Sequence, residues 1–476
     1  MKIVMCTSEM VPFSKTGGLA DVCGALPLAL EKLGCEVIVF TPFYKQTKDL
    51  KLKIELISKE ILSTKIGKNM NVFFIKRDSY FDRDFLYGPK EGDYPDNLER
   101  FSFFCKKILD SLKKINFKPD IIHCHDWQTA LVPVYLKTIY KDDSFYRKIK
   151  TILTIHNLGY QGIFSKEKFP LLGLNWSLFG IEGLEFYDQI NILKGGIKFS
   201  DFISTVSPTY AEEIQRKECG CGLEGVLVGR KESLFGILNG IDYSIWNPEI
   251  DKFIFKGYST SKIEDKYVNK RELQRLCNLG VKDLPLIGMV GRLAEQKGLD
   301  LLSESIEEVF SLDLQMVILG AGDQRYQELL EKIAKKYPKK FSLCIKFDDP
   351  LAHKIYAGSD IFLIPSKYEP CGLGQMISFK YGTVPLVHKT GGLSDTVTDF
   401  DPFAKKGDGF TFIPYSKENF LKALKFALYI FKKDKKNWTC LVKKVMQYDF
   451  SWQASAKRYV ELYEQLGSFY NSDCPS

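Results

Sequence analysis

The sequence contains two copies of a segment suited to binding an anion. KTGGL occurs at residues 15–19 and again at 389–393, and an aspartate follows each copy, Asp21 or Asp395. Each copy lies between an expected strand and an expected helix. A Gly-Gly pair there lets backbone N–H groups approach a ligand, and the positive end of the helix dipole favours an anion. The alternative is that both copies are ordinary glycine turns.

A basic loop is the second candidate for anion chemistry. GRLAEQKG (291–298) places Arg292 and Lys297 directly after an expected strand. Arginine grips a diphosphate through paired N–H donors and lysine adds a compact charge, so the two could stabilise a departing diphosphate without a metal. A solvated basic loop is the alternative. The position at the carboxyl end of a strand favours the functional interpretation.

A carboxylate follows another expected strand in SKYEPCGLGQ (366–375). Glu369 at such a turn can accept sugar hydroxyls or oppose a developing positive charge. It could equally cap the helix that follows. Cys371 could suggest a thiol nucleophile, but no histidine is close in sequence, and a cysteine at a helix start is often only packed.

Three of the five histidines of the chain fall at positions 123, 125 and 156. The H-x-H pair could bind zinc, but no matched set of further ligands stands at metal spacing, and the lone C-x-C at 219–221 is weak for the same reason. His123 alternates inward on its strand and suits the core. His125, Asp126 and His156 lie at strand ends, where polar groups reach a ligand.

These residues require a scaffold that brings strand ends together. Apolar runs alternating with helical patterns predict a doubly wound α/β fold. A break at 237–248 with Gly, Asn and Pro, followed by a polar stretch, is typical of a linker. We expect two Rossmann-like doubly wound domains facing an interdomain cleft, at residues 1–242 and 243–452, with a C-terminal helix (453–476) crossing back to the first domain. The expected strands lie at 2–10, 36–42, 71–75, 120–125, 150–157, 201–207, 285–292, 314–322, 359–366 and 383–389.

Composition narrows the class of protein. The chain has 476 residues, with 45% hydrophobic and 26% charged, which excludes disorder, collagen and coiled coil. No apolar run approaches the ~18 residues of a membrane span, and Glu9 interrupts the N-terminal apolar run before a signal peptide could form. We therefore expect a cytoplasmic protein with reduced cysteines. A net charge of +8 with dispersed lysines argues against a nucleic-acid partner.

Several familiar signatures are absent or weak. No G-x-x-x-x-G-K-[ST] occurs, which argues against a P-loop NTPase. The segment 320–322 gives only G-x-G, which disfavours a nicotinamide oxidoreductase. D-x-D occurs at 82–84 and 399–401, but the tripeptide is too common to indicate a metal site.

The motifs taken together resemble those of bacterial and plant glycogen/starch synthases. The resemblance runs in order along nearly the whole chain, which makes it highly specific. It rests on KTGGLADV (15–22), HDW (125–127), HN (156–157), NGID (239–242), GRLAEQKG (291–298), EPCGLGQ (369–375) and KTGGLSDTV (389–397).

The resemblance implies a GT-B fold and transfer of glucose from ADP-glucose to the non-reducing 4-OH of an α-1,4-glucan such as glycogen, with retention at the anomeric carbon. It implies neither a metal nor a cofactor. Glu369, His156, Arg292, Lys297 and Asp126 are carried over as catalytic residues. The positions carried over as substrate-binding are Lys15, Gly17, Gly18, Asp21, Tyr94, Asn97, Trp127, Asn157, Asn239, Phe347, Cys371, Gly372, Leu373, Thr390, Gly391 and Gly392.

Retention without an obvious nucleophile suggests front-face attack, with a leaving phosphate oxygen accepting the proton. Double displacement would require Glu369 close beneath the anomeric carbon. The sequence departs from the family at Gln128, where many relatives carry histidine, and at Phe347, where tyrosine is commoner beside the base. The alternatives are a same-fold transferase using UDP-glucose or another acceptor, and a non-catalytic glucan-binding regulator.

Overall fold

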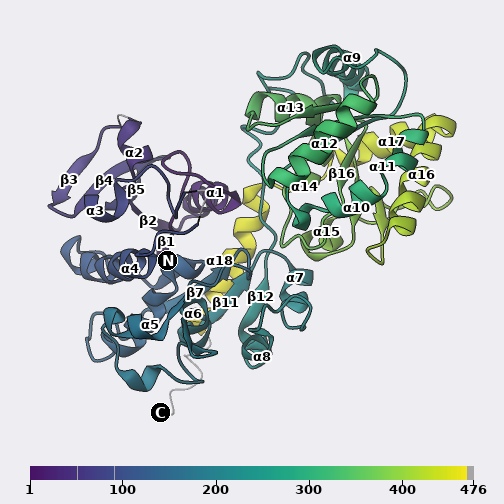
Figure 1. Ribbon diagram of the computed structural model, residues 1–476. Helices are drawn as coiled ribbons and strands as arrows, with labels where there is room; N and C mark the ends of the chain where they lie inside the picture. The colour runs from purple at the N-terminus through teal and green to yellow at the C-terminus, as the bar shows by residue number, and fades with distance from the viewer. Residues whose placement is uncertain (51, 90–91, 469–476) are drawn as a thin grey trace. The chain divides into compact units, whose positions relative to one another are not determined.

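The computed structural model describes residues 1–50, 52–89 and 92–468, which form two compact units (Figure 1). The first contains the described residues of Met1–Gly240 together with Trp452–Ser468, and the second contains Ile241–Ser451. The divisions lie close to the expected boundaries after residues 242 and 452. Each unit is built around one large sheet with helices packed against it.

The first unit has a nine-stranded sheet in the order β12-β11-β7-β6-β1-β2-β5-β4-β3. The strands from β12 to β5 are parallel, and β4 and β3 extend the sheet as an antiparallel hairpin. Parallel strands are buried on both faces, which is why their sequences read as continuous apolar runs. Their bounds are β1 Lys2–Cys6, β2 Glu36–Pro42, β3 Glu55–Ser58, β4 Ile61–Ile66, β5 Met70–Ile75, β6 Ile121–His125, β7 Lys150–Ile155, β11 Phe202–Thr205 and β12 Leu234–Gly236.

A second, small antiparallel sheet lies in the first unit, with strands β8 (Ile163–Ser165), β10 (Gln189–Asn191) and β9 (Glu185–Phe186). It follows His156 along the chain and was not expected from the sequence. The helices of the unit are α1 Gly18–Lys32, α2 Lys45–Asp49, α3 Asp78–Phe81, α4 Asn97–Lys114, α5 Leu131–Thr138, α6 Ile192–Phe199, α7 Pro208–Glu213, α8 Glu224–Val228 and α18 Trp452–Ser468.

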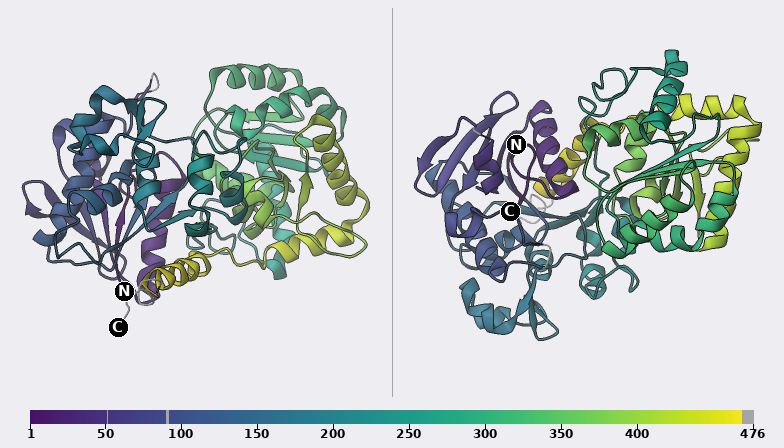
Figure 2. Two further views of the ribbon diagram at one scale, coloured as in Figure 1. Left: turned by 90° about the horizontal axis from the view of Figure 1, so that it is seen from below. Right: turned by 45° about the horizontal axis from the view of Figure 1, so that its top comes forward.

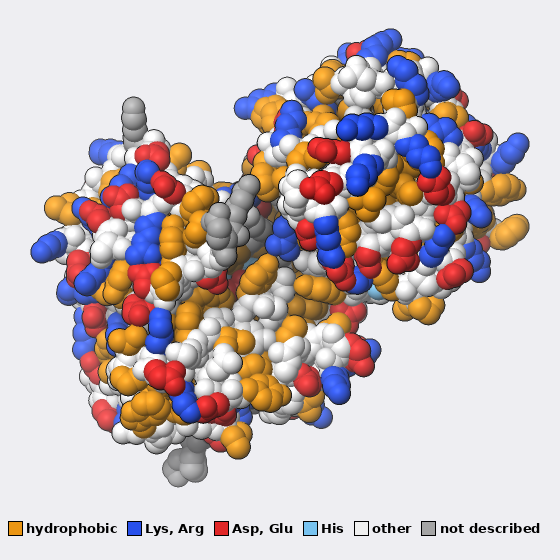
Figure 3. Space-filling view, viewed as in Figure 1, with side chains coloured by type: hydrophobic (Ala, Val, Ile, Leu, Met, Phe, Trp, Pro, Cys, Tyr) orange, Lys and Arg blue, Asp and Glu red, His pale blue; other side chains and the backbone are white. Residues whose placement is uncertain are grey.

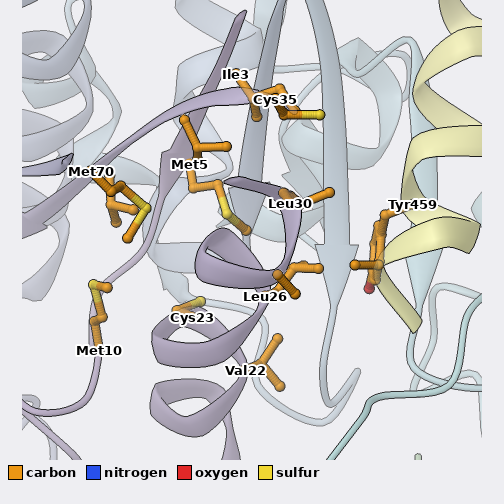
Figure 4. Packing of buried hydrophobic residues seen from close by; sticks show 14 of the residues in the cluster. Ile3, Met5, Met10, Val22, Cys23, Leu26, Leu30, Cys35, Met70 and Tyr459 are labelled. Carbon is orange, nitrogen blue, oxygen red and sulfur yellow. The ribbon is translucent and has the colours of Figure 1, made fainter. Parts of the chain in front are cut away.

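The C-terminal helix α18 completes the core of the first unit. It packs against α1, as both views in Figure 2 show with α18 in yellow and α1 in purple. Figure 4 shows Val22, Leu26 and Leu30 of α1 in the same buried cluster as Ile3 of β1 and Tyr459 of α18. Residues at the two ends of the chain therefore share one hydrophobic core.

The second unit has a six-stranded sheet in the order β15-β14-β13-β16-β17-β18, all parallel. Numbered along the chain this is 3-2-1-4-5-6, the order of the Rossmann fold. The strands are β13 Leu286–Val290, β14 Gln315–Leu319, β15 Phe341–Cys344, β16 Ile361–Ile364, β17 Val384–His388 and β18 Phe410–Phe412. The helices are α9 Lys266–Leu276, α10 Leu299–Glu304, α11 Ile306–Ser311, α12 Gln324–Lys336, α13 Asp349–Gly358, α14 Gly374–Lys380, α15 Gly391–Thr396, α16 Lys417–Lys433 and α17 Lys435–Val445.

The expected strands are confirmed in position, each shortened by one or more residues at its ends, except 36–42, which matches β2 in full, and 71–75, which lacks the first residue of β5. On the face drawn in Figure 3, basic and acidic side chains are interspersed over each unit. No helix within the described residues is long and apolar enough to span a membrane.

Candidate active site

The basic loop and the Glu369 loop meet at one point of the second sheet. β13 and β16 are neighbouring parallel strands, so the loops that follow them leave from the same edge. The strand order reverses between these two strands, and ligands of open α/β sheets bind at such switch points. The predicted site residues Lys297 and Glu369 are brought together here, as their positions after strands suggested.

Lys297 ends the short 3-10 helix η6 (Glu295–Lys297), and its Nζ lies 2.6 Å from Glu369 Oε2. The hydroxyl of Ser366 donates to the same carboxylate oxygen at 2.9 Å. Glu369 is only 7% exposed. A buried carboxylate needs such partners because desolvation penalises its charge. The carboxylate therefore has a defined position beside a fixed cation.

Arg292 begins the same loop and is exposed. Its Nη2 donates to Gln296 Oε1 at 3.0 Å. A pocket of about 60 Å³ opens beside it, with Gly291, Lys297, Ser366 and Glu369 in its lining. The other lining residues are Met289, Val290, Phe362, Leu363, Ile364, Pro365, Gly372, Leu373 and Gly374. The pocket is therefore lined by apolar residues at the strand ends and by the charged side chains of Lys297 and Glu369.

The second KTGGL copy holds the Glu369 loop through backbone hydrogen bonds and close packing. The Gly392 N–H donates to the carbonyls of Glu369 at 3.1 Å and of Pro370 at 3.2 Å. A Cβ at Gly392 would lie 1.9 Å from the Cys371 carbonyl oxygen, and one at Gly391, whose φ is +45°, would lie 2.0 Å from that of Glu369. Both positions require glycine. The Gly392 N–H is therefore used within the protein, and binding of the diphosphate by the backbone around Thr390, Gly391 and Gly392 stays a prediction.

The first KTGGL copy binds a carboxylate of its own unit. Glu9, just after β1, accepts hydrogen bonds from the N–H of Thr16 and of Gly17, from the Thr16 hydroxyl, and from the Tyr87 hydroxyl at 3.2 Å. The backbone N–H groups of Thr16 and Gly17 therefore bind a carboxylate of the protein itself, and binding of a ligand anion by this loop stays a prediction. Sequence reasoning missed Glu9 and Tyr87. A carboxylate directly after an apolar strand was the available signal for Glu9.

Lys15 and Asp21 of this copy form an exposed ion pair at 2.8 Å. Within the described residues, a Cβ built at Gly17 or Gly18 meets no atom within 4 Å beyond its chain neighbours and the backbone of its own helix. Unlike the second copy, this loop does not need its glycines for packing within the described residues. Its glycines are compatible with the close approach of a ligand.

Asp126 and His156 follow the neighbouring strands β6 and β7. The His156 N–H donates to Asp126 Oδ1 at 2.7 Å. Asp126 has φ +56° and ψ −176°, a strained conformation for a residue other than glycine. The carboxylate therefore orients the backbone around His156, and the strain at this position is typical of a functional site.

Burial shifts the pKa values of these groups. It raises the pKa of Asp126 to about 7, with nearby Glu9 adding to the shift. Burial also raises the pKa of Glu9, against the hydrogen bonds that it accepts. It lowers the pKa of His156 to about 3. At neutral pH this part of the unit holds a neutral imidazole and a carboxyl group close to its titration point.

Two residues predicted to contact substrate, Trp127 and Asn97, also pack within the first unit. Trp127 is 6% exposed and packs edge-on against Phe101, with ring centroids 5.1 Å apart. Asn97 is 1% exposed; its Oδ1 accepts from Arg100 and its Nδ2 donates to the Tyr87 carbonyl. These contacts fix the Asp126 and Tyr87 segments, and contact of Trp127 and Asn97 with substrate stays a prediction. Both ring nitrogens of His123 form hydrogen bonds, Nδ1 with the Tyr463 hydroxyl and Nε2 with the Thr154 hydroxyl. The ring therefore has a structural role in the core.

The remaining predicted residues lie at strand or helix ends. Tyr94 stacks on the guanidinium groups of Arg83 and Arg100. Asn239, after β12, is 7% exposed, and its Oδ1 has no hydrogen-bond partner within the described residues. Phe347, after β15, is 89% exposed. Asn157 accepts from Gly159, Cys371 and Thr390 are buried, and Gly372 and Leu373 line the pocket described above.

Comparison with known proteins decides the family. Residues 2–229 match the starch synthase catalytic domain family, and residues 274–437 match glycosyl transferases group 1. The glycogen synthase of Pseudothermotoga lettingae is 48% identical over 484 residues, covering 98% of this chain and 99% of the relative. That of Fervidobacterium nodosum is 47% identical over 487 residues, with coverage of 98% and 99%. The chain belongs to the glycogen/starch synthase family.

Solved structures agree with this assignment to the glycogen/starch synthase family. The catalytic domain of Arabidopsis thaliana starch synthase IV, bound to ADP and acarbose, matches with a TM-score of 0.89 and 35% identity, over 98% of this chain and 99% of that one. Sucrose-phosphate synthase of Thermosynechococcus elongatus, at 17% identity, shares the fold with a TM-score of 0.61, over 98% and 99%. The chain is a glycosyltransferase enzyme with the two-domain α/β fold of GT-B proteins.

Proposed function

We propose that the chain transfers glucose from ADP-glucose to the non-reducing 4-OH of an α-1,4-glucan, with retention at the anomeric carbon and release of ADP, in glycogen biosynthesis. The observation that carries the proposal is the cluster of half-buried Lys297 with buried Glu369 and Ser366 at the switch point of the second sheet. The synthases that resemble the chain over nearly its whole length, one of them bound to ADP, support this choice of donor.

The chemistry follows from the charges at this cluster. As the bond from the anomeric carbon to the diphosphate weakens, negative charge builds on ADP and positive charge on the sugar ring. Arg292 and Lys297 stabilise the leaving diphosphate because their donors are already positioned after β13. Glu369 accepts hydrogen bonds from hydroxyls of the donor glucose and stabilises the positive charge on the sugar ring. Its fixed position beside Ser366 keeps reorganisation during the reaction small.

Residues of the first unit are proposed to contact the sugar and the donor. His156 touches the 6-OH side of the donor glucose, and Asp126, which holds the backbone N–H of His156, keeps that segment in place. Lys15, with Gly17 and Gly18, contacts the donor. We propose front-face attack, in which a leaving phosphate oxygen takes the proton from the acceptor hydroxyl. No intermediate bonded to the protein is then required.

The test is transfer of labelled glucose to glycogen from ADP-glucose and, in parallel, from UDP-glucose. Lys297→Met and Glu369→Gln are each expected to lower kcat by about 100-fold or more, as loss of a transition-state donor does elsewhere. Lys367→Met is the matched control: Lys367 lies in the same loop but pairs with Glu295 at 2.5 Å and Asp300 at 3.1 Å. It should keep near-normal kcat.

Three outcomes would contradict the proposal. Faster turnover of UDP-glucose than of ADP-glucose would show that UDP-glucose is the donor. Glycogen binding without release of ADP would indicate a regulator without catalysis. Activity that a chelator removes and manganese restores would assign the leaving charge to a metal and not to the two cations. Cell fractionation tests the predicted cytoplasmic location.

A further inference from the structure

Two histidines at the ends of neighbouring strands share a hydrogen bond. β6 ends at His125, and its parallel neighbour β7 is followed by His156, with His125 paired to Thr154 in the register. This register places the two imidazoles side by side. His125 Nδ1 lies 2.9 Å from His156 Nε2, and the ring centroids are 5.2 Å apart.

Both rings are neutral at physiological pH. Burial lowers the pKa of His125 well below its usual value, and lowers that of His156 to about 3. Two neutral imidazoles can share one hydrogen bond in only two ways. Either His125 donates its Nδ1–H to His156 Nε2, or His156 donates its Nε2–H to His125 Nδ1. The two choices leave opposite groups on the remaining ring nitrogens.

The surroundings of His125 separate these two choices. Its Nε2 is buried and has no hydrogen-bond partner within the described residues. His123 stacks on the face of the ring, with centroids 4.2 Å apart and planes at 28°, so it cannot accept an N–H that lies in the ring plane. If Nε2 carried the hydrogen, it would be an orphaned buried donor, which native structures rarely contain. If Nδ1 carries the hydrogen, Nε2 is left only with an acceptor lone pair that has no donor.

We infer that His125 donates its Nδ1–H to His156 and thereby holds His156 in the Nδ1–H tautomer, so that His156 offers an N–H donor to a sugar hydroxyl oxygen. His125 is then a positioning residue that acts through His156. The ligand side of this inference rests on the proposed function, in which His156 contacts the donor glucose. The tautomer itself follows from the geometry of the free protein.

The first test is a long-range ¹H–¹⁵N correlation spectrum of the full chain labelled with [¹⁵N]histidine. The chain has only five histidines, and the signals of His156 are assigned by their loss in His156→Gln. Protonated Nδ1 on His156 is the expected result. Protonated Nε2 on His156 would overturn the inference. The measurement needs neither substrate nor activity.

The second test compares two replacements of His125. In His125→Asn the amide nitrogen takes the place of Nδ1 as a donor, whereas His125→Leu has a similar volume and no donor. The readout is the ratio of kcat/KM for ADP-glucose to that for ADP-6-deoxyglucose. We expect about a tenfold preference for ADP-glucose in the wild type, retained in the Asn variant and lost in the Leu variant.

An equal fall of both rates in His125→Leu, with an unchanged ratio, would show a merely structural role and overturn the inference. If His125→Leu does not fold, the wild-type spectrum still decides the tautomer. If the wild type transfers no glucose from ADP-glucose, the proposed function fails while the spectrum still tests the hydrogen bond. The two failures are therefore distinguishable.

Discussion

Replacing Gly392 by alanine should displace the loop that holds Glu369. A Cβ at this position would lie 1.9, 2.6 and 2.6 Å from the O, C and Cα atoms of Cys371. All three are backbone atoms, so the loop must move. Overpacking of this kind costs about 1–3 kcal/mol. Weakening the hydrogen bonds from the Gly392 N–H to Glu369 and Pro370 adds about 1 kcal/mol.

The matched control is Gly18→Ala in the first KTGGL copy, where the added methyl group meets no other part of the described chain within 4 Å. Gly18 is the first residue of α1, where alanine is at least as favourable as glycine. Urea denaturation should therefore show Gly392→Ala less stable than Gly18→Ala by about 2–4 kcal/mol. Hydrogen exchange measured by mass spectrometry should rise in the peptide 366–375 for Gly392→Ala alone.

Activity should fall with the displacement of the loop. A shift of about 1 Å in a positioned group can lower a rate about 100-fold, and Glu369 lies in the displaced segment. Equal stability of the two glycine variants, with unchanged exchange in 366–375, would refute the role assigned to the second KTGGL copy. It would show that the loop tolerates the methyl group and that its register does not depend on Gly392.

Further predictions concern the first unit. The folded-state pKa of Asp126, about 7, lies above its unfolded value near 4, so the folded protein binds more protons between these pH values and loses stability as the pH rises through them. Asp126→Asn lacks this loss. In urea denaturation, its free energy of unfolding relative to the wild type should therefore increase by up to about 4 kcal/mol between pH 4 and 8. A difference in free energy between the two proteins that does not change with pH would contradict the pKa. Tyr463→Phe removes the partner of the buried His123 Nδ1 at 2.8 Å and should cost about 1–3 kcal/mol. The exposed Tyr429→Phe serves as its control, and equal stability of the two would contradict the anchoring of α18.

The strands and the order of the motifs could be read from the sequence because both are local properties. A strand buried on both faces in a parallel sheet appears as an uninterrupted apolar run, and the residue that follows such a run lies at the strand's carboxyl end. The same rule allows site residues to be predicted from the sequence: Arg292, Lys297, Glu369, Asp126 and His156. The hairpin β3–β4 was missed because β3 is exposed and lacks an apolar run.

The contacts that give these residues their roles were decided only by the tertiary structure. Lys297 and Glu369 are 72 residues apart, and His123 and Tyr463 are 340 apart. The two copies of KTGGL are identical in sequence, yet one binds the carboxylate of Glu9 and the other supports the backbone of the Glu369 loop. Identical residues acquire different partners because strand order, which depends on pairing across the whole sheet, determines which loops become neighbours.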